Sequence, residues 1–254
     1  MPKRVNSTGF SLPEDFREWQ KYFPTQPLNT SLYTGERARY ESVVYAGLVQ
    51  ALGLESSVED LKLVAPEEWT IAQMGSSRLH LQFLQFLIKM IGAKRILEIG
   101  TFAGLSAIAF AQAAPTDAKI VTIEKFAKFA DLARENIRRN AFENTVRVIE
   151  GDALNLIEHG ELTGNFDFVF IDGDKDRYLD YVKFALTRLT SGGLIVVDDA
   201  FFQGDVFNEP PTTEKGQGVR ACLDWVVAQK DLLVTVVPVS NGVLLVHRRT
   251  ADQG

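Results

Sequence analysis

The sequence predicts an α/β protein with a mostly parallel seven-stranded sheet, helices on both faces and a final antiparallel hairpin. From about residue 95 onward, short apolar runs alternate with longer helical patterns, which is typical of parallel strands joined by helical crossovers. The strand-like runs at 232–238 and 242–248 are separated only by residues 239–241. A connection this short joins antiparallel neighbours, since a parallel crossover needs about a dozen residues.

The individual elements follow this alternation. Ahead of the hairpin, strands are predicted at 95–99, 119–123, 146–149, 166–171 and 194–197. Helices are predicted at 103–114, 126–140, 176–189 and 218–229, with a short turn after Asp152. The stretch 203–218 contains adjacent prolines and several acidic residues, and long irregular stretches of this kind are often binding loops.

The residues before the first strand read as helices, at 14–22, 36–52, 58–64 and 78–91. We expect them to form a helical layer over the sheet. The prediction is a single domain, with residues 1–75 as an N-terminal helical extension and residues 76–254 as the core.

Composition excludes several classes of protein. The net charge is −6 and the sequence pI is about 5.2. Lys and Arg are scattered apart from the short cluster Arg138-Arg139, which argues against a nucleic-acid partner. No apolar run approaches the roughly 20 residues that cross a membrane, and the first residues lack the apolar core of a secretory signal. With Cys222 as the single cysteine, we expect a cytoplasmic protein.

The sharpest local signal runs from Arg95 to Ser106, where a predicted strand enters a turn with two glycines. Gly100 permits a tight turn against a ligand, and Gly104 permits close approach of the next helix. The spacing G-x-x-x-G differs from the dinucleotide-binding G-x-G-x-x-G. Glu98, just before the turn, suits a cationic ligand rather than a pyrophosphate, and S-adenosylmethionine carries an ammonium and a sulfonium. The motif alone leaves an ordinary glycine-rich turn open.

Acidic residues also follow the second and third strands. Glu124 ends the second strand, where doubly wound folds place an acid on ribose hydroxyls; a solvated strand end is the alternative. Glu150-Gly-Asp-Ala153 follows the third strand, in a position suited to an adenine edge. Because parallel strands end along one edge of a sheet, the three segments together predict one crevice for S-adenosylmethionine.

The fourth and fifth strands end in clustered carboxylates. Asp172, Asp174 and Lys175 follow the fourth strand, and Asp198-Asp199 follow the fifth. Adjacent strands lie about 4.8 Å apart, so Asp172 and Asp198 should face each other. Carboxylates this close repel unless they are protonated or share a cation. Oxygen ligands favour Mg²⁺, with Ca²⁺ or Mn²⁺ as alternatives. Helix N-capping is the alternative role of Asp172 or Asp174.

The histidines contribute no comparable signal. The spacing of His80, His159 and His247 is not that of metal ligands, so we expect none of the three in a site.

Over residues 74–248 the chain resembles a known family, and four segments carry the resemblance. They are Met-Gly-Ser-Ser-Arg-Leu-His-Leu-Gln-Phe from Met74, Glu98-Ile-Gly, Asp-Gly-Asp-Lys-Asp-Arg-Tyr from Asp172, and Gly-Gly-Leu-Ile-Val-Val-Asp-Asp from Gly192. The chain resembles the cation-dependent O-methyltransferases of small molecules, which include the caffeoyl-coenzyme A and catechol O-methyltransferases. The resemblance implies the class I methyltransferase (Rossmann-like) fold. It also implies metal-assisted methyl transfer from S-adenosylmethionine to one hydroxyl of a catechol-type molecule.

The resemblance also implies roles for single residues. Cofactor contacts are implied at Ser76, Glu98, Gly100, Thr101, Ser106, Glu124, Ala153 and Asp174. Metal ligands are implied at Asp172, Asp198 and Asp199, with Lys175 as the general base. Gln203 falls where the family uses an asparagine near the acceptor. Apart from the resemblance, Phe201, Phe202 and Trp225 are candidates for aromatic walls of the acceptor pocket, with plain core packing as the alternative.

Two departures from the family leave the preferred metal and the acceptor open. Asp199 replaces the usual asparagine, and Phe201-Phe202-Gln203 replaces the more common Leu-Trp-Asn. The acidic residues of loop 203–218 argue against a phosphate-rich coenzyme A tail, so free catechols or flavonoids are preferred over caffeoyl-coenzyme A.

Three alternatives stay open at this point: a methyltransferase for another acceptor such as a nucleic acid or protein, a nicotinamide-dependent oxidoreductase, and a non-enzymatic S-adenosylmethionine-binding module. The family resemblance also suggests a homodimer.

Overall fold

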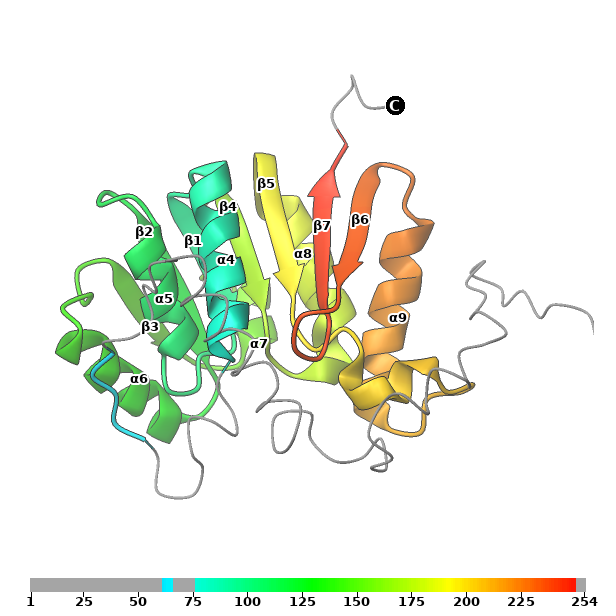
Figure 1. Cartoon of the computed structure of the whole chain (residues 1–254), viewed down its shortest axis with the longest axis horizontal. Coiled ribbons are helices and arrows are strands. Elements are labelled where there is room, and N and C mark those ends of the chain that lie inside the picture. The colour runs from blue at the N-terminus through cyan, green and yellow to red at the C-terminus, as the bar shows by residue number, and fades with distance from the viewer. Residues whose placement is uncertain (1–60, 66–75, 250–254) are drawn as a thin grey trace, which may run out of the picture.

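The computed structural model describes residues 61–65 and 76–249 (Figure 1), and its centre is a sheet of seven strands in the order β3-β2-β1-β4-β5-β7-β6. The strands are β1 (Arg95–Ile99), β2 (Lys119–Glu124), β3 (Val146–Glu150), β4 (Phe166–Ile171), β5 (Leu189–Val197), β6 (Leu232–Val237) and β7 (Val243–Arg248). The first five are parallel, whereas β7 runs antiparallel to both β5 and β6. The predicted sheet and its final hairpin are therefore confirmed.

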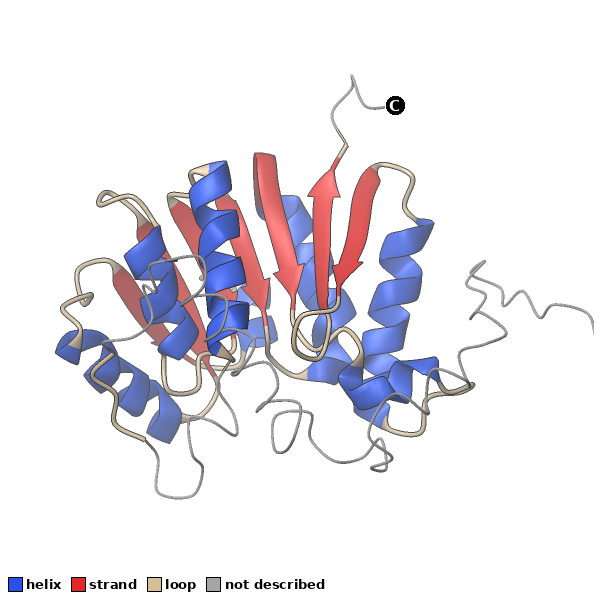
Figure 2. Cartoon of the chain, viewed as in Figure 1, coloured by secondary structure: helices blue, strands red, loops and turns tan. Residues whose placement is uncertain are grey.

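Helices cover both faces of the sheet (Figure 2). They are α4 (Arg78–Ile91), α5 (Leu105–Ala113), α6 (Ala127–Arg139), α7 (Ala153–Glu158), α8 (Tyr178–Arg188) and α9 (Glu214–Ala228). One apolar core lies between the sheet and α4, α5 and α6, and a second lies between the sheet and α7, α8 and α9. β1 and β4 are buried on both faces along most of their length, and eight of their eleven side chains are apolar, as is usual in parallel sheets.

Several element bounds differ from the predictions for local reasons. The strand β5 begins at Leu189 rather than at 194, with a register irregularity against β4. The helix α9 begins at Glu214 rather than at 218, because the Thr213 side chain accepts a hydrogen bond from the Gly216 amide and caps the helix. Part of the predicted irregular stretch forms a short 3₁₀ helix, Phe202–Phe207.

The helix predicted at 58–64 is wrong for its described part, since residues 61–65 are not helical. Two side chains of α6 hold this segment instead. Asn140 and Asn136 exchange hydrogen bonds with the backbone N–H and C=O groups of Lys62 and Val64, respectively, at 2.7–3.1 Å. The helices predicted at 14–22 and 36–52 lie outside the described residues.

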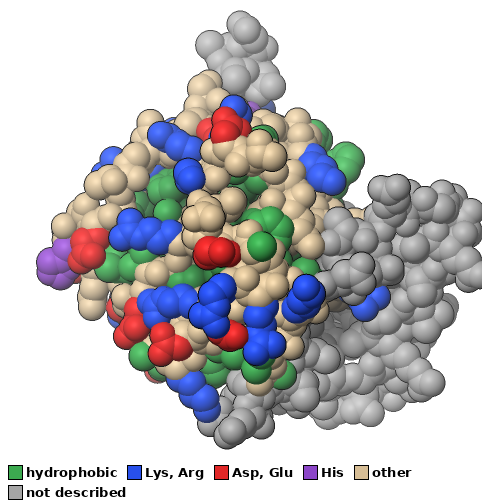
Figure 3. Space-filling model, turned by 90° about the vertical axis from the view of Figure 1, so that its left-hand side faces the viewer, with side chains coloured by type: hydrophobic (Ala, Val, Ile, Leu, Met, Phe, Trp, Pro, Cys, Tyr) green, Lys and Arg blue, Asp and Glu red, His purple; other side chains and the backbone are tan. Residues whose placement is uncertain are grey.

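The short basic cluster noted in the sequence lies on α6 and is paired locally. Arg138 and Arg139 both form ion pairs with Glu135, three and four residues before them. On the face shown in Figure 3, basic and acidic side chains lie among one another. In the part of the chain that the structure describes, no helix has the length and apolar character that a membrane span requires.

Candidate active site

A cavity of about 540 Å³ lies at the carboxyl ends of the parallel strands. Its walls come from the segments that follow β1, β2, β3, β4 and β5, joined by Asn241 from the turn between β6 and β7. This is the edge where doubly wound sheets bind ligands, and the topology therefore brings together residues that are up to 165 positions apart, from Ser76 to Asn241.

The turn after β1 is packed directly against the segment after β4. Gly100 has a φ of +95°, and a Cβ atom there would lie 2.3 Å from the backbone oxygen of Asp172. Only glycine fits this position, since it combines a left-handed backbone with backbone contact. The amide of Asp172 donates to Ile99 O at 2.8 Å. The two turns are thereby held as one wall of the cavity.

Glu98 lies fully buried behind this wall, with 0% of its surface exposed. Its carboxyl group accepts hydrogen bonds from the hydroxyls of Ser106 and Thr122. Burial in this low-dielectric position raises the pKa of Glu98 to about 8, although the two hydroxyls act in the opposite direction. A cation brought near Glu98 would favour its charged form, so the site is suited to a positively charged ligand.

Glu124, at the end of β2, is also buried and supports the turn after β1. Its carboxylate accepts hydrogen bonds from the amides of Thr101 at 3.3 Å, Phe102 at 2.8 Å and Phe126 at 3.0 Å. The same carboxylate lines the cavity, where it is placed to bind a ligand hydroxyl.

Lys125 forms a bridge between two other parts of the wall. Its ammonium lies 3.0 Å from the Asp152 carboxylate and 2.9 Å from the Asp174 carboxylate. The half-exposed Lys125 side chain thus joins the segments after β3 and β4 at the solvent side of the cavity.

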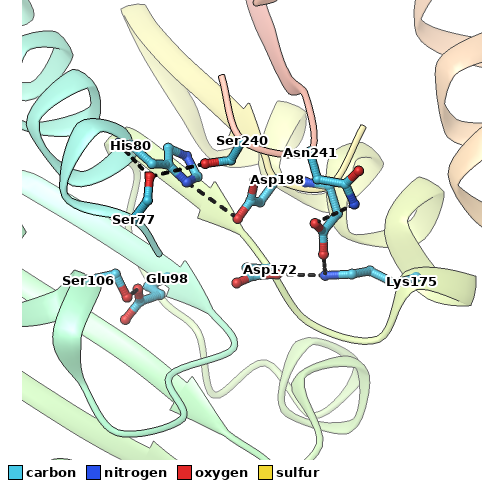
Figure 4. A network of polar contacts seen from close by, with 10 residues as sticks. Ser77, His80, Glu98, Ser106, Asp172, Lys175, Asp198, Ser240 and Asn241 are labelled. Atoms are coloured by element: carbon cyan, nitrogen blue, oxygen red, sulfur yellow. Dashed lines mark hydrogen bonds and ion pairs between the residues drawn. The ribbon is translucent and has the colours of Figure 1, made fainter. Parts of the chain in front are cut away.

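Three carboxylates and one lysine meet at the tips of β4 and β5 (Figure 4). The Lys175 ammonium lies 2.6 Å from Asp172 Oδ1 and 2.8 Å from Asp199 Oδ2. Asp198 accepts a hydrogen bond from the Asp199 amide at 2.8 Å, and only 2% of its surface is exposed. One ammonium is therefore shared within a cluster of three acids.

Burial and the charges of this cluster shift its pKa values strongly. Burial, Asp172 and Asp199 together hold the pKa of Asp198 well above its usual range. Burial by itself would lower the pKa of Lys175, but Asp172 and Asp199 outweigh burial and keep that pKa well above its usual value. In this arrangement, Lys175 carries a proton and acts as the counter-ion of the cluster.

The cluster offers the type of ligand that divalent cations prefer, although its side chains are not arranged around an ion. Among the described residues, no three acidic, histidine or cysteine side chains converge closely enough to surround an ion. However, the Lys175 ammonium already lies between Asp172 and Asp199, where a cation would bind. Its single positive charge does not neutralise the three clustered carboxyl groups when all of them are ionised. Hard oxygen ligands with this excess charge are those that Mg²⁺, Ca²⁺ and Mn²⁺ prefer.

Most of the residues predicted for the site do line the cavity. They are Ser76, Gly100, Thr101, Ser106, Glu124, Ala153, Asp172, Asp174, Lys175, Asp198, Asp199 and Gln203. Glu98 lies behind the wall, in contact with Ser106. Phe201 lies outside the lining, where its ring packs against Gly242 and Phe207, whereas Phe202 takes a place in the wall.

Sequence reasoning missed three polar residues beside the cluster. Asn241 donates to Asp199 Oδ1 at 2.9 Å and accepts from the Gln203 amide at 2.9 Å. Ser240, also in the hairpin turn, lies 3.3 Å from Ser77 Oγ. His80 of α4 approaches Asp198 to 3.7 Å. The short turn after β6 was a signal for the hairpin, but nothing in the local sequence indicates that it returns to the site.

Comparison with known proteins gives a consistent result. The O-methyltransferase family matches residues 52–249. A caffeoyl-CoA O-methyltransferase of Petunia hybrida is 31% identical over 239 residues, covering 84% of this chain and 98% of that protein. A catechol O-methyltransferase of Niastella koreensis is 39% identical over 143 residues, covering 55% of this chain and 64% of that protein.

Solved structures share the architecture. An O-methyltransferase from Bacillus cereus, in complex with SAH, has a TM-score of 0.63 and 28% identity, and covers 85% of this chain and 93% of that chain. The O-methyltransferase TomG from Streptomyces achromogenes, in complex with SAM, has a TM-score of 0.66 and 25% identity, with 94% and 100% covered.

Proposed function

The chain belongs to the O-methyltransferase family, and on that premise we propose that it methylates one hydroxyl of a catechol-type small molecule, with S-adenosylmethionine as the methyl donor and a divalent cation as helper. Family membership sets aside the nicotinamide-dependent alternative and confirms the predicted class I methyltransferase fold. The observation that carries the finer proposal is the cluster of Asp172, Asp198 and Asp199 beside the cofactor turn, within one cavity.

We propose that the cofactor binds along the turns after β1, β2 and β3. Two relatives of similar architecture were solved with SAH or SAM, which supports this location. Ser76, Gly100, Thr101, Ser106, Glu124, Ala153 and Asp174 line this part of the cavity, and Glu98 acts on it through Ser106. Glu124 is placed for ribose hydroxyls, and the buried negative charge available at Glu98 favours the cationic cofactor.

We propose that Asp172, Asp198 and Asp199 hold the divalent cation, with Mg²⁺ as the expected ion. A bound cation supplies positive charge that lowers the pKa of an acceptor hydroxyl. Asn241 orients Asp199 through its hydrogen bond, and such supporting contacts fix the direction in which a ligand side chain points.

Lys175 is the proposed general base. Its ammonium must first release to water the proton that Asp172 and Asp199 stabilise, and a cation beside these carboxylates would favour that release by lowering the Lys175 pKa. The neutral amine could then accept the proton of the acceptor hydroxyl within the cavity. Holding the hydroxyl oxygen in line with the methyl group contributes further, since positioning can supply about 7–11 kcal/mol.

The choice between acceptors depends on loop 203–218 beside the cavity. We expected the acidic residues of loop 203–218 to disfavour a coenzyme A tail. Asp205 of this loop is occupied internally, because it accepts hydrogen bonds from Thr212 and Thr213 at 2.7–3.0 Å, and Lys215 lines the cavity. Free catechols and flavonoids remain our first choice, with caffeoyl-coenzyme A as the direct competitor. The homodimer, the single-domain organisation and the cytoplasmic location stay predictions.

A panel of acceptors tests this proposal. The protein, S-adenosylmethionine and Mg²⁺ are incubated with vicinal diols (a simple catechol, a flavonoid and caffeoyl-coenzyme A) and with matched compounds that lack one of the two hydroxyls. Mass spectrometry should detect a single added methyl group on at least one diol and none on its monohydroxy partner. Equal methylation of both members of a pair would contradict the catechol assignment.

A further inference from the structure

His80 is an unusual residue because it is completely buried and its ring forms no hydrogen bond with the described residues. Its exposed fraction is 0%, and in the part of the chain that the structure describes, neither ring nitrogen has a hydrogen-bond partner. Buried polar side chains are normally paired, and leaving one unpaired costs about 1–3 kcal/mol. An imidazole held at this cost calls for a ligand that residues 61–65 and 76–249 do not supply.

The imidazole faces the acidic cluster. Figure 4 shows the His80 ring on α4 directed toward Asp198, and the distance from His80 Nδ1 to Asp198 Oδ2 is 3.7 Å. This distance is too long for a hydrogen bond. It does match two ligands of one ion, because atoms that are each about 2.1 Å from a metal lie roughly 3–4 Å apart.

The neighbours of His80 hold the ring in place. Its backbone amide donates to Ser77 Oγ at 3.2 Å, which caps α4, and Phe170 packs near the ring in an edge arrangement with centroids 6.1 Å apart. The ring therefore belongs to a fixed helix start and a packed core, as expected for a preorganised ligand.

We propose that His80 is a nitrogen ligand of the divalent cation bound at Asp198, so that the metal site of this chain is a mixed nitrogen–oxygen site. This inference rests on the proposed function and adds to it the class of ion that the site prefers. Imidazole nitrogen suits transition ions better than Mg²⁺ or Ca²⁺. The site should accordingly prefer Mn²⁺ or Co²⁺ over Mg²⁺, in contrast to the expectation drawn from carboxylates alone.

Pulsed electron paramagnetic resonance of the Mn²⁺-loaded full-length protein tests this proposal directly. In protein carrying ¹⁵N only in histidine, the spectrum should show the coupling of a directly bound imidazole nitrogen. The variant His80→Gln should lose this coupling. The matched control is His247→Gln, since Nδ1 of His247 lies 2.8 Å from Gly193 O in the middle of β5, away from the acidic cluster at the strand tip, and this variant should retain the coupling.

Affinity measurements give a second readout. We expect His80→Gln to weaken Mn²⁺ binding by about 10–100-fold and to leave Mg²⁺ binding almost unchanged, which removes the preference. Bound Mn²⁺ without histidine coupling in the wild-type protein would overturn the role of His80 and leave the carboxylate site standing. Failure of the wild-type protein to bind any Mn²⁺ or Mg²⁺ would overturn the proposed metal site itself. The spectrum of the wild-type protein decides the question even where a variant fails to fold.

Discussion

At the scale of single residues, the acidic side chains of the site either share one counter-ion or have none among the described residues. Lys175 neutralises part of an acidic cluster that contains two further carboxylates besides its closest partner Asp172. Glu98 is buried, and no cationic side chain of the described residues lowers its pKa. Both observations have one physical meaning: the described residues do not balance the charges of this cavity by themselves, and cationic ligands would.

The raised pKa of Glu98 gives a prediction for the protein without cofactor. Because the native state holds this proton more tightly than the unfolded chain does, the free energy of unfolding should fall as pH rises from about 4.5 to about 8. The slope contributed is about 1.4 kcal/mol per pH unit. The glutamine side chain of Glu98→Gln cannot ionise. The free energy of unfolding of the variant relative to that of the wild type should therefore rise across this pH window and level off above it.

Urea unfolding at pH values from 5 to 9 measures this difference. The matched control is Glu161→Gln, because Glu161 is exposed and its substitution should leave the slope in place. If the free energy of unfolding changed with pH in the same way in the wild type and in Glu98→Gln, the raised pKa of Glu98 would be contradicted.

At the scale of elements, the turn after β1 and the segment after β4 behave as one unit. Gly100 is the contact point, and its missing Cβ is what allows the approach to Asp172 O. The variant Gly100→Ala should therefore destabilise the protein through two effects. A left-handed backbone at a residue with a side chain costs about 1–2 kcal/mol, and the displaced neighbour should add about 1–3 kcal/mol.

The variant Gly192→Ala separates these two effects. Gly192 has a similar φ of +86°, but no atom lies within 4 Å of the position of its Cβ. Chemical denaturation should show a loss for Gly192→Ala that reflects the backbone alone, and a clearly larger loss for Gly100→Ala. Equal losses would mean that the contact with Asp172 is not tight.

The elements also show what the sequence could predict. Strands β1 to β5 follow from their apolar runs, and the hairpin follows from the three residues between its strands. The segment 61–65 could not be assigned in this way, because the side chains that hold it extended, Asn136 and Asn140, lie on α6, more than 70 positions away. Local patterns report local preference, and long-range hydrogen bonds can override it.

The part of the candidate site that lies at strand ends could be predicted from the sequence, and the part that depends on long-range packing could not. The residues after β1, β2, β4 and β5 are acidic or glycine and stand at strand ends, so the parallel topology alone brings them together. His80 and Asn241 enter the site from a helix and a hairpin turn. Their contribution depends on how those elements pack, which no spacing within the sequence encodes.

At the scale of the whole molecule, the proposed function places two binding sites along the carboxyl edge of the sheet. The turns after β1, β2 and β3 offer Glu124 and the hydroxyls around Glu98, and the ends of β4 and β5 offer the acidic cluster. Figure 1 shows these strand ends side by side along one edge of the molecule. Methyl transfer requires that a donor and an acceptor meet, and a shared cavity is the simplest arrangement that achieves it.

In the proposed function, a divalent cation at Asp198 activates the acceptor while the cofactor binds separately. The most direct measurement compares wild type and Asp198→Ala by calorimetric titration with S-adenosylmethionine and by methyl transfer to a vicinal diol, with and without a chelator. We predict nearly unchanged cofactor affinity in Asp198→Ala. Methyl transfer should fall by at least about a hundredfold, both in that variant and in wild type with chelator. Undiminished methyl transfer by the wild-type protein in the presence of the chelator would contradict this role of the cation.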